Sequence, residues 1–477
     1  MKKSITYNAT LNGIRKASYI LFPFITFPYV SRVLGTDGLG QYNFANSYVS
    51  YFLLAAGLGI NSYAVREGAR FRDNKGQISD FASEMFIINM ISTVVSYVFL
   101  FLSIIVFSKI RSYDLLIYIF SVEIIFTTIG MEWLYSVYEE YRYITIRTLL
   151  FKVISIVAMF SLVNSFDDVA IYALITVFAN VGSNILNFIH ARKKWKFHLC
   201  DIGSLKKHMK PILTLFSVNV AVMVYVHSDT VILGLLQSDH EVGLYSLSAK
   251  VYSIIKGLLS AMLIVSVPKL SMYYGKGDNE SFDRLLQRIF DLVTVVLLPC
   301  VIGLFSLSEN IAVLVGGEAY RSAASSLKIL SVSLLFCLYG YIGVQCVLVP
   351  TRSDKSLSIF TIVTAIVNIV LNLLLIPFWA ENAAAFTTML AELLMLILCV
   401  LRGRKMARIR ILDKNFFQAL LGSSIIFVIC LLCKGLIANN IVCIVSSMIL
   451  SGVGYSAFLV ASKNELFRTT IKKLFKH

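Results

Sequence analysis

Fourteen stretches of about twenty mostly apolar residues follow one another along the 477-residue chain. A helix needs about 20 such residues to cross the roughly 30 Å hydrocarbon core of a bilayer, so each stretch predicts a membrane-spanning helix. The predicted spans are 12–33, 42–64, 82–108, 115–136, 147–164, 169–190, 212–235, 246–270, 287–307, 326–349, 357–377, 383–401, 416–436 and 440–461. Only 15% of the residues are charged, against about 25% in soluble domains. We therefore expect an all-α, polytopic membrane protein.

The positions of Lys and Arg indicate which ends of the spans face the cytoplasm. If the N-terminus is cytoplasmic, 34 of the 43 Lys and Arg residues fall in cytoplasmic segments, five on the opposite side and four inside spans. Both termini are therefore expected in the cytoplasm. The net charge of +16 follows from this topology, so nucleic acid is not an expected partner. No loop is long enough to fold as an enzyme domain, and no catalytic or metal-binding site is expected.

A short motif recurs at an offset of 203 residues. "DGLGQY" at residues 37–42 begins the second span and "HEVGLY" at residues 240–245 begins the eighth, which aligns Gly40 with Gly243 and Tyr42 with Tyr245. An offset of six helices, an even number, makes the two repeats parallel in the membrane. We therefore expect two six-helix bundles followed by two extra helices, an architecture of the MOP and MATE type.

The predicted organisation is a bundle at 1–191, a basic linker at 192–211, a bundle at 212–401, a basic loop at 402–415, two helices at 416–461 and a basic tail at 462–477. The linker, the loop and the tail are placed in the cytoplasm. The positive charge of the linker is explained by topology, or alternatively by contact with anionic lipid headgroups.

Polar side chains recur at helical spacing in several spans. They are Asn8, Asn12, Asn43, Asn46, Ser50, Asn368 and Asn372, joined by Tyr245 and Tyr252 on one face of the eighth span. Contact with lipid would leave such groups without hydrogen bonds, so they must face protein or water. They either bond to neighbouring helices within each bundle or line a shared wet cavity, and their presence in both halves favours the cavity.

Charged residues inside or beside the spans are the other candidates for function, because each costs roughly 2.5–3.5 kcal/mol at the bilayer centre. The cations are Arg15, Arg32, Lys152, Lys250, Lys256 and Lys328, and the acids are Glu123, Asp229 and Glu392. Each cation either lines a cavity that accepts an anion or forms an internal ion pair. Arg15, near a helix end, can alternatively extend its charged group to the membrane surface. Each acid either takes up a proton during transport or is the structural partner of a polar neighbour. Arg32, which lies near Asp37 in the sequence, is predicted to form a gate salt bridge or to contact a phosphate. Alternatively, it caps and anchors a tight turn.

Four segments of the sequence resemble the Wzx-type polysaccharide flippases of the MOP exporter superfamily. They are "SRVLGTDGLGQYNFA" from residue 31, "SDTVILGLLQSDHEVGLYSLSAKVYS" at 228–253, "LVGGEAYRSAASSLKILS" at 314–331 and "IVNIVLNLLLIPFWAENAAAFTTMLAE" at 366–392. One departure concerns the Gly-rich turn that the family usually has after the proline that corresponds to Pro377. This chain has Phe-Trp-Ala-Glu-Asn at residues 378–382 instead.

The resemblance implies a flippase that moves an undecaprenyl-pyrophosphate-linked oligosaccharide, for O-antigen or a related surface polysaccharide, across the bacterial cytoplasmic (inner) membrane. It implies alternating access driven by a proton or sodium gradient, with no bound cofactor. It also implies a path for the lipid tail along the last two helices. Membrane lipids and the polysaccharide polymerase machinery are the expected partners.

Two other functions stay open on the sequence. A multidrug exporter of the same superfamily moves organic cations, so acids should dominate its cavity, whereas cations outnumber acids inside these spans. A membrane polysaccharide polymerase or acyltransferase usually needs a large outer loop or an intramembrane His with an acid partner. His227 and Asp229 stand two residues apart and therefore point to different faces of a helix.

Overall fold

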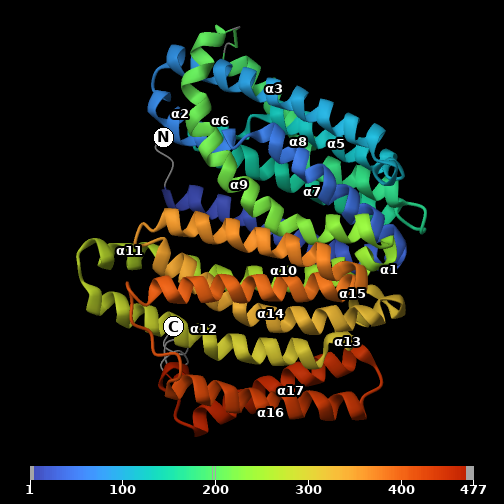
Figure 1. The fold of residues 1–477 in the computed structure, drawn as a ribbon, viewed down its shortest axis with the longest axis vertical. Helices are drawn as coiled ribbons and strands as arrows, with labels where there is room; N and C mark the ends of the chain where they lie inside the picture. Colours follow the sequence, from blue (N-terminus) through green and yellow to red (C-terminus); the bar gives the residue numbers. More distant parts are fainter. Residues whose placement is uncertain (1–4, 196, 199, 469–477) are drawn as a thin grey trace. The chain divides into compact units, whose positions relative to one another are not determined.

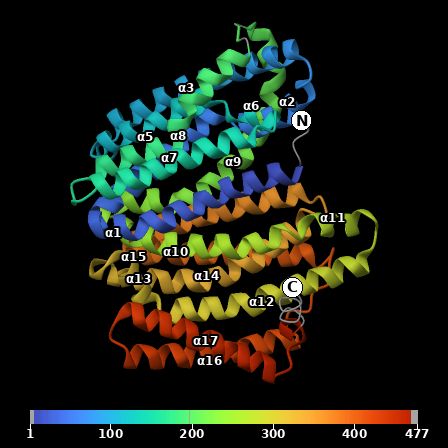
Figure 2. The ribbon, with the colours of Figure 1, turned by 180° about the vertical axis from the view of Figure 1, so that it is seen from behind.

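The computed structural model describes residues 5–195, 197–198 and 200–468, and every regular element in that part of the chain is a helix (Figures 1 and 2). Eleven helical segments among the described residues are long and apolar enough to cross a membrane. The prediction of an all-helical, multi-span membrane protein is confirmed.

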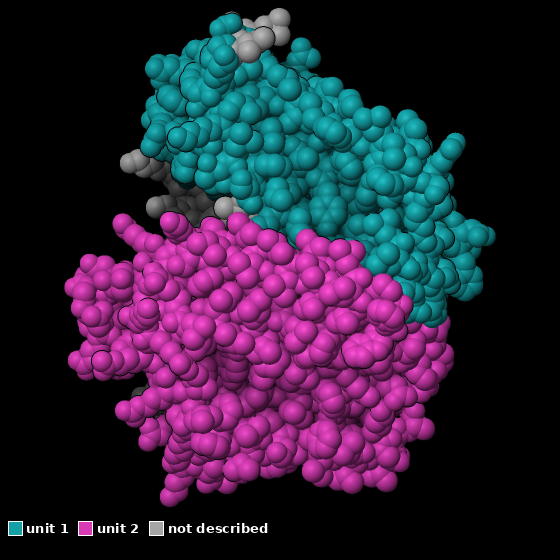
Figure 3. Space-filling view, in the orientation of Figure 1, with its two compact units in different colours: residues 1–243 teal, residues 244–477 magenta. Residues whose placement is uncertain are grey.

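The chain divides into two compact units, one ending at Gly243 and the other beginning at Leu244 (Figure 3). The first contains α1 (Ile5–Gly57), α2 (Ile60–Phe71), α3 (Lys75–Val106), α4 (Ser108–Arg111), α5 (Asp114–Gly130), α6 (Glu132–Val137), α7 (Tyr141–Leu162), α8 (Val169–Lys194), α9 (Ile202–Leu236) and the first turn of α10 (Asp239–Ile264). Within it, α9 packs against α1, α2 and α3. Helix α9 begins inside the segment that the sequence assigns to the linker, and the predicted domain boundaries stay predictions.

The second unit contains the rest of α10 and the C-terminal helices. These are α11 (Val267–Gly275), α12 (Asn279–Ser306), α13 (Ser308–Gly316), the 3-10 helix η1 (Glu318–Ala323), α14 (Ala324–Ile342), the π-helix η2 (Gly343–Leu348), α15 (Asp354–Gly403), α16 (Lys414–Leu436) and α17 (Asn440–Ala461). Helices α14 and α15 pack on each other, and α16 packs between α12 and α17. Residues 469–477 of the predicted basic tail lie outside the described residues.

Several helices begin at an Asn or Asp whose side chain accepts hydrogen bonds from the first backbone N–H groups. Asn74 accepts from Gly76 and Gln77 at the start of α3, and Asp413 accepts from Phe416 at the start of α16. The first N–H groups of a helix have no partner within the helix, and a short polar side chain supplies one. The sequence thus determines locally where these helices start.

Two helices of about fifty residues contain a break in the middle. In α1 the break is at Gly35, with φ 68°, and in α15 it is at Ala380, with φ 46°. Positive φ is accessible to glycine but strained for alanine. The breaks lie between the predicted spans 12–33 and 42–64 and between 357–377 and 383–401, so each helix is interrupted where the sequence predicts a turn.

Large apolar side chains are exposed along the outer faces of the membrane helices. On α3, for example, Phe99 and Ile105 are 62% and 74% exposed. The buried positions of the same helix include small polar residues such as Ser92, Thr93 and Ser96. This distribution, with apolar groups outside and hydrogen-bonding groups inside, is the one that a lipid environment requires.

Candidate functional site

Arg15, the predicted cation of the first span, lies on α1 and forms an ion pair with Glu132 at the start of α6. The Arg15 side chain is 14% exposed and that of Glu132 is 39% exposed. A guanidinium carries five N–H donors in a planar fork, which suits both carboxylate and phosphate. The side chains of Asn8 and Asn12, predicted on the same stripe, lie outside the described part of the structure.

Three further predicted residues are buried in the first unit. Lys152 on α7 is 5% exposed, and its ammonium lies 5.6 Å from the centre of the Phe22 ring on α1, a cation–π contact. Glu123 on α5 accepts a hydrogen bond of 2.9 Å from the Asn180 amide on α8. Asp229 on α9 is 5% exposed. The structure places these three charges on three different helices of the first unit, α5, α7 and α9.

The polar stripe on the second half of α1 makes bonds along its own helix. The Asn43 amide donates to the Leu39 carbonyl at 2.7 Å, and the Ser50 hydroxyl donates to the Asn46 carbonyl at 2.8 Å. Bonds to the preceding turn satisfy such groups without a neighbouring helix. All three stripe residues are half-buried, so part of each stays accessible.

Three predicted cations differ in exposure. Arg32 on α1 and Lys328 on α14 are exposed, whereas Lys250 on α10 is half-buried. Of these three cations, Lys250 is therefore the one that the helices of its unit partly enclose.

The second unit joins two predicted residues in one ion pair. The Lys256 ammonium on α10 lies 3.0 Å from Glu392 Oε1 on α15, and the Tyr252 hydroxyl donates to the same oxygen at 3.3 Å. The Glu392 side chain is 7% exposed, while that of Lys256 is 32% exposed. The carboxylate is thus enclosed, whereas part of the lysine side chain stays exposed.

The predicted asparagines of the second unit are fully enclosed. The Asn372 amide donates to Asn368 Oδ1 at 3.2 Å, and the Thr387 hydroxyl donates to Asn372 Oδ1 at 2.5 Å. Nearby, the Tyr245 and Thr388 hydroxyl oxygens lie 3.4 Å apart. Thr387 and Thr388 follow the break in α15, so this network connects the two halves of that helix.

The two copies of the repeated motif contact each other at their glycines. A methyl group added at Gly40 would lie 1.9 Å from the Asp239 carbonyl oxygen, and one added at Gly243 would lie 2.0 Å from the Thr36 carbonyl oxygen. Thr36 and Asp239 are separated by the same 203 positions as the two glycines. Each glycine therefore packs against the residue of the other copy that lies four positions before the other glycine. Only a residue without a side chain fits in this contact.

A charged cluster near the start of α9 is not predicted from the sequence. The Glu84 carboxylate on α3 contacts the Lys207 ammonium at 2.9 Å and His208 Nε2 at 2.7 Å. His208 Nδ1 in turn lies 2.8 Å from the Tyr63 hydroxyl on α2. The available signal is Glu84 within the otherwise uncharged predicted span 82–108, which calls for a cationic partner. That partner lies 123 positions away and only the fold brings it near.

Comparison with known proteins identifies relatives along most of the chain. A protein of Escherichia coli (strain K12) described as an O-antigen transporter is 23% identical over 85% of this chain and 98% of its own length. A protein of Shigella dysenteriae with the same description is 24% identical over 83% of this chain and 98% of its own length. The flippase AglR of Haloferax volcanii is 28% identical over 38% of this chain and 38% of its own.

The fold is similar to that of a solved flippase. The lipid II flippase MurJ, in an inward closed conformation, matches 97% of this chain and 100% of its own with a TM-score of 0.77 and 16% identity. The family model described as "Polysaccharide biosynthesis protein" matches residues 2–274, more than half of the chain. The chain belongs to the polysaccharide biosynthesis protein family.

Proposed function

We propose that this protein is a membrane transporter, not an enzyme, and that it flips an undecaprenyl-pyrophosphate-linked oligosaccharide repeat unit for O-antigen or a related surface polysaccharide. The observation that carries the proposal is the similarity, over 85% of the chain, to a protein described as an O-antigen transporter. The MurJ-like fold supports it, because a substrate with a charged head, a polar glycan and a lipid tail needs a helical membrane protein that can shield the head.

The proposed substrate suits the side chains found in the helices. A pyrophosphate must lose water to cross a bilayer, and charge-assisted hydrogen bonds from Arg or Lys replace that water. Arg15 in the first unit and Lys250 in the second are the cations that we assign to the pyrophosphate. The half-buried amides and hydroxyls of Asn43, Asn46 and Ser50 are assigned to the sugar hydroxyls.

We further propose fourteen membrane crossings in the bacterial cytoplasmic membrane, with both termini in the cytoplasm. Breaks in α1 and α15 support two crossings for each of these helices, and the apolar α5, although only 17 residues long, supports another. The excess of Lys and Arg in alternate loops supports the orientation.

A groove in the second unit supports the proposed path for the lipid tail. Its volume is about 450 Å³, and it lies between α10, α12, α16 and α17. Its walls include Leu258, Pro299, Ile426, Met448 and Tyr455. A prenyl chain that enters this groove would be shielded from water and from the surrounding lipid. It would bring in no polar group that needs a hydrogen-bond partner.

The transport cycle that we propose is alternating access between two six-helix bundles, driven by a proton or sodium gradient. Glu123, Asp229 and Glu392 are the acids assigned to ion coupling, because each is buried among membrane helices. The polysaccharide polymerase machinery is the proposed partner that takes the exported unit.

Complementation of a strain deleted for its own O-unit flippase tests the proposal. The wild-type gene is expected to restore long surface polysaccharide. The variants Arg15→Ala and Lys250→Ala are expected to fail at normal protein level, as measured by immunoblot. Lys276→Ala, which removes an exposed lysine outside the membrane helices, serves as the control and is expected to complement.

Failure of the wild-type protein with several donor glycan pathways, together with raised drug resistance, would instead support the multidrug exporter. If both cation variants complement fully, the assignment of Arg15 and Lys250 to the pyrophosphate is wrong, while the flippase function stands.

A further inference from the structure

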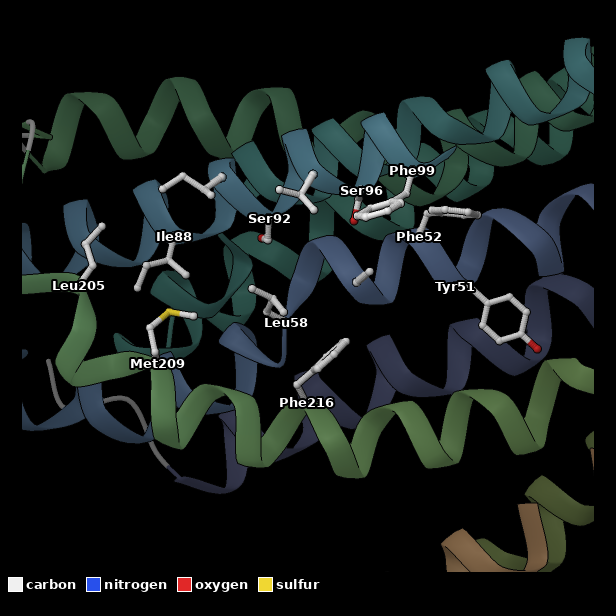
Figure 4. Close-up of a pocket in the computed structure, with 13 residues that line it drawn as sticks. Tyr51, Phe52, Leu58, Ile88, Ser92, Ser96, Phe99, Leu205, Met209 and Phe216 are labelled. Carbon is white, nitrogen blue, oxygen red and sulfur yellow. The ribbon is translucent and has the colours of Figure 1, made fainter. Parts of the chain in front are cut away.

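An apolar groove opens on the first unit, separate from the charged residues assigned to the substrate. It has a volume of about 530 Å³, and its walls come from α1, α3 and α9 (Figure 4). The α3 wall consists of Ile88, Ile91, Ser92, Val95, Ser96 and Phe99. These positions recur at i, i+3, i+4, i+7, i+8 and i+11, so they form one continuous stripe along the helix.

The groove is lined almost wholly by hydrocarbon. The Ser92 hydroxyl, one of its few polar groups, donates to the Ala56 carbonyl at 2.5 Å and is thereby satisfied. Val95 and Ile91 are 47% and 55% exposed, so the groove communicates with the surroundings of the protein. In a bilayer those surroundings are lipid chains, and a chain that enters the groove gains contacts without leaving a polar group unpaired.

The length of the groove corresponds to one leaflet. From Ile88 to Phe99 the α3 wall rises about 16 Å, at 1.5 Å per residue. Half of the roughly 30 Å hydrocarbon core is about 15 Å. A single acyl chain of a phospholipid matches this length, whereas a polyprenyl chain of many isoprene units exceeds it.

One end of the groove carries positive charge. Leu205 and Met209, in the first turns of α9, line the groove beside Ile88 (Figure 4). Lys206 and Lys210 follow them directly on the helix and are exposed. Because 205 and 209 lie one turn apart, as do 206 and 210, the two lysines form a stripe next to the groove wall.

The position of these lysines is fixed by the charged cluster described above. Lys207 and His208 bind Glu84 on α3, which holds the first turns of α9 against the helix that forms the groove. The basic end and the apolar groove are therefore parts of one preformed surface. A headgroup at Lys206 and Lys210 places its acyl chain at the groove entrance.

We infer that this groove binds an anionic glycerophospholipid, with one acyl chain between α1, α3 and α9 and the phosphate at Lys206 and Lys210. The lipid is a bound component of the membrane and not the transported substrate. The inference depends on the location of the protein in a membrane and goes beyond the proposed transport.

Native mass spectrometry of the purified full-length protein tests the inference, with dipalmitoyl phosphatidylglycerol and dipalmitoyl phosphatidylcholine as probes. The wild-type protein is expected to retain phosphatidylglycerol in preference to phosphatidylcholine. Lys206→Gln with Lys210→Gln is expected to weaken retention of phosphatidylglycerol by roughly thirtyfold, which corresponds to about 1 kcal/mol for each lysine beside an anionic headgroup. Lys276→Gln with Lys355→Gln removes two exposed lysines elsewhere and is expected to change nothing.

A second pair of variants tests the groove itself. Val95→Trp fills it, and Val94→Trp adds the same side chain to the neighbouring position, which is 57% exposed and does not line the groove. Val95→Trp is expected to reduce retention at least tenfold and Val94→Trp to leave it unchanged. Both positions face outward, and thermal unfolding checks that each variant is folded.

Three results would overturn the inference. Equal loss from both tryptophan variants, or none from Val95→Trp, would show that the lipid does not enter the groove. Equal retention of the two phospholipids by the wild-type protein would show that charge does not select the lipid. Displacement of phosphatidylglycerol by undecaprenyl phosphate at equal concentration would assign the groove to the tail of the substrate.

Discussion

The ion pair between Lys256 and Glu392 tests whether a buried cation serves structure or transport. Removal of one member of a buried pair leaves the other charge without compensation, which costs about 3–5 kcal/mol. We expect Glu392→Gln and Lys256→Met each to lower the thermal unfolding temperature in detergent. The double variant should recover most of that loss, because no buried charge is then left alone.

A transport assay distinguishes a structural role of the Lys256–Glu392 pair from a role in transport. If Lys256 contacts the pyrophosphate, the double variant regains stability but still fails to complement a flippase deletion. Recovery of both properties would mean that the pair is structural. A double variant no more stable than the singles would contradict the ion pair itself.

Glu309 on α13 provides a test of pH dependence. The hydrogen bond from the Lys434 ammonium at 2.7 Å, with a further contribution from Arg321, holds the pKa of its carboxyl below the usual value of 4.5. A depressed carboxyl pKa adds stability above the unfolded pKa, and this stability is lost as the pH falls through the folded pKa. These groups are partly exposed, so the contribution is about 1 kcal/mol at most.

We therefore expect Glu309→Gln to lower the unfolding temperature at pH 7, and the difference from wild type to shrink as the pH falls below 4.5 and through the lowered pKa of this carboxyl. Thermal unfolding in detergent over this pH range measures it. Glu280→Gln is the matched control, because Glu280 also bonds an arginine but is 86% exposed. A difference that grows toward low pH would contradict the ion pairs of Glu309.

At the residue scale, the sequence predicts which charges lie in the membrane but not which charges pair. Hydropathy places Lys256 in the eighth span and Glu392 in the twelfth. Their contact depends on how each helix is rotated about its axis, and that rotation is set by the packing of many side chains at once. Arg15 and Glu132 illustrate the same limit, since the acid stands at a helix start that the hydropathy pattern does not resolve.

At the scale of elements, the reciprocal glycine contacts predict that two distant substitutions have the same effect. Gly40→Ala and Gly243→Ala each place a methyl group about 2 Å from a backbone oxygen, and backbone atoms cannot rotate away. We expect each variant to lose roughly 1–3 kcal/mol, the usual range for overpacking. Thermal unfolding in detergent measures the loss.

Gly435→Ala is the control for these variants, because an added methyl group there meets nothing within 4 Å. As alanine favours a helix by up to about 1 kcal/mol over glycine, this variant should be unchanged or more stable. A loss at only one of the repeat glycines would show that the two contacts are not equivalent.

The break in α15 predicts a stabilising substitution. Ala380 adopts φ 46° and ψ −125°, a conformation that glycine adopts readily and other residues adopt at about 1–3 kcal/mol. Ala380→Gly should therefore raise stability by about 1 kcal/mol, after allowance for the greater freedom of glycine in the unfolded chain. Ala383→Gly, three residues later in a buried and regular helix, should lower stability by about the same amount.

Thermal unfolding of both variants decides whether the backbone at Ala380 is strained. If Ala380→Gly and Ala383→Gly lower stability equally, the backbone at Ala380 is not strained. The sequence already singled out residues 378–382, because the Gly-rich turn of related flippases is replaced there. It did not show which residue takes the strained conformation, since that depends on how the two halves of α15 pack through Asn372 and Thr387.

At the scale of the whole molecule, helix length supports the proposed number of crossings. At 1.5 Å per residue, the 53 residues of α1 and the 50 residues of α15 correspond to about 80 Å and 75 Å of helix. The hydrocarbon core is roughly 30 Å thick. Neither helix fits as a single crossing. Each has its break in the middle, so two crossings joined outside the membrane fit the length of each helix.

Hydropathy alone divides both helices into two spans and thereby predicts the number of crossings more directly than the helix boundaries do. Local signals such as the caps at Asn74 and Asp413 also predict where spans begin. The assembly of the chain into units is less predictable. Helix α9 packs on α1, α2 and α3, and those contacts come from side chains too far apart in the sequence for any local pattern.

Cysteine labelling in intact cells tests the topology that follows. In a background without the eight native cysteines, Asp37→Cys and Trp379→Cys, exposed residues beside the two breaks, should react with a membrane-impermeant maleimide from outside. Lys276→Cys and Lys355→Cys should react only after permeabilisation, because the distribution of Lys and Arg places them in the cytoplasm. Protection of Asp37→Cys or Trp379→Cys under both conditions would place the breaks inside the membrane and exclude fourteen crossings. Labelling of all four from the same side would contradict the odd number of crossings between each break and the basic loops.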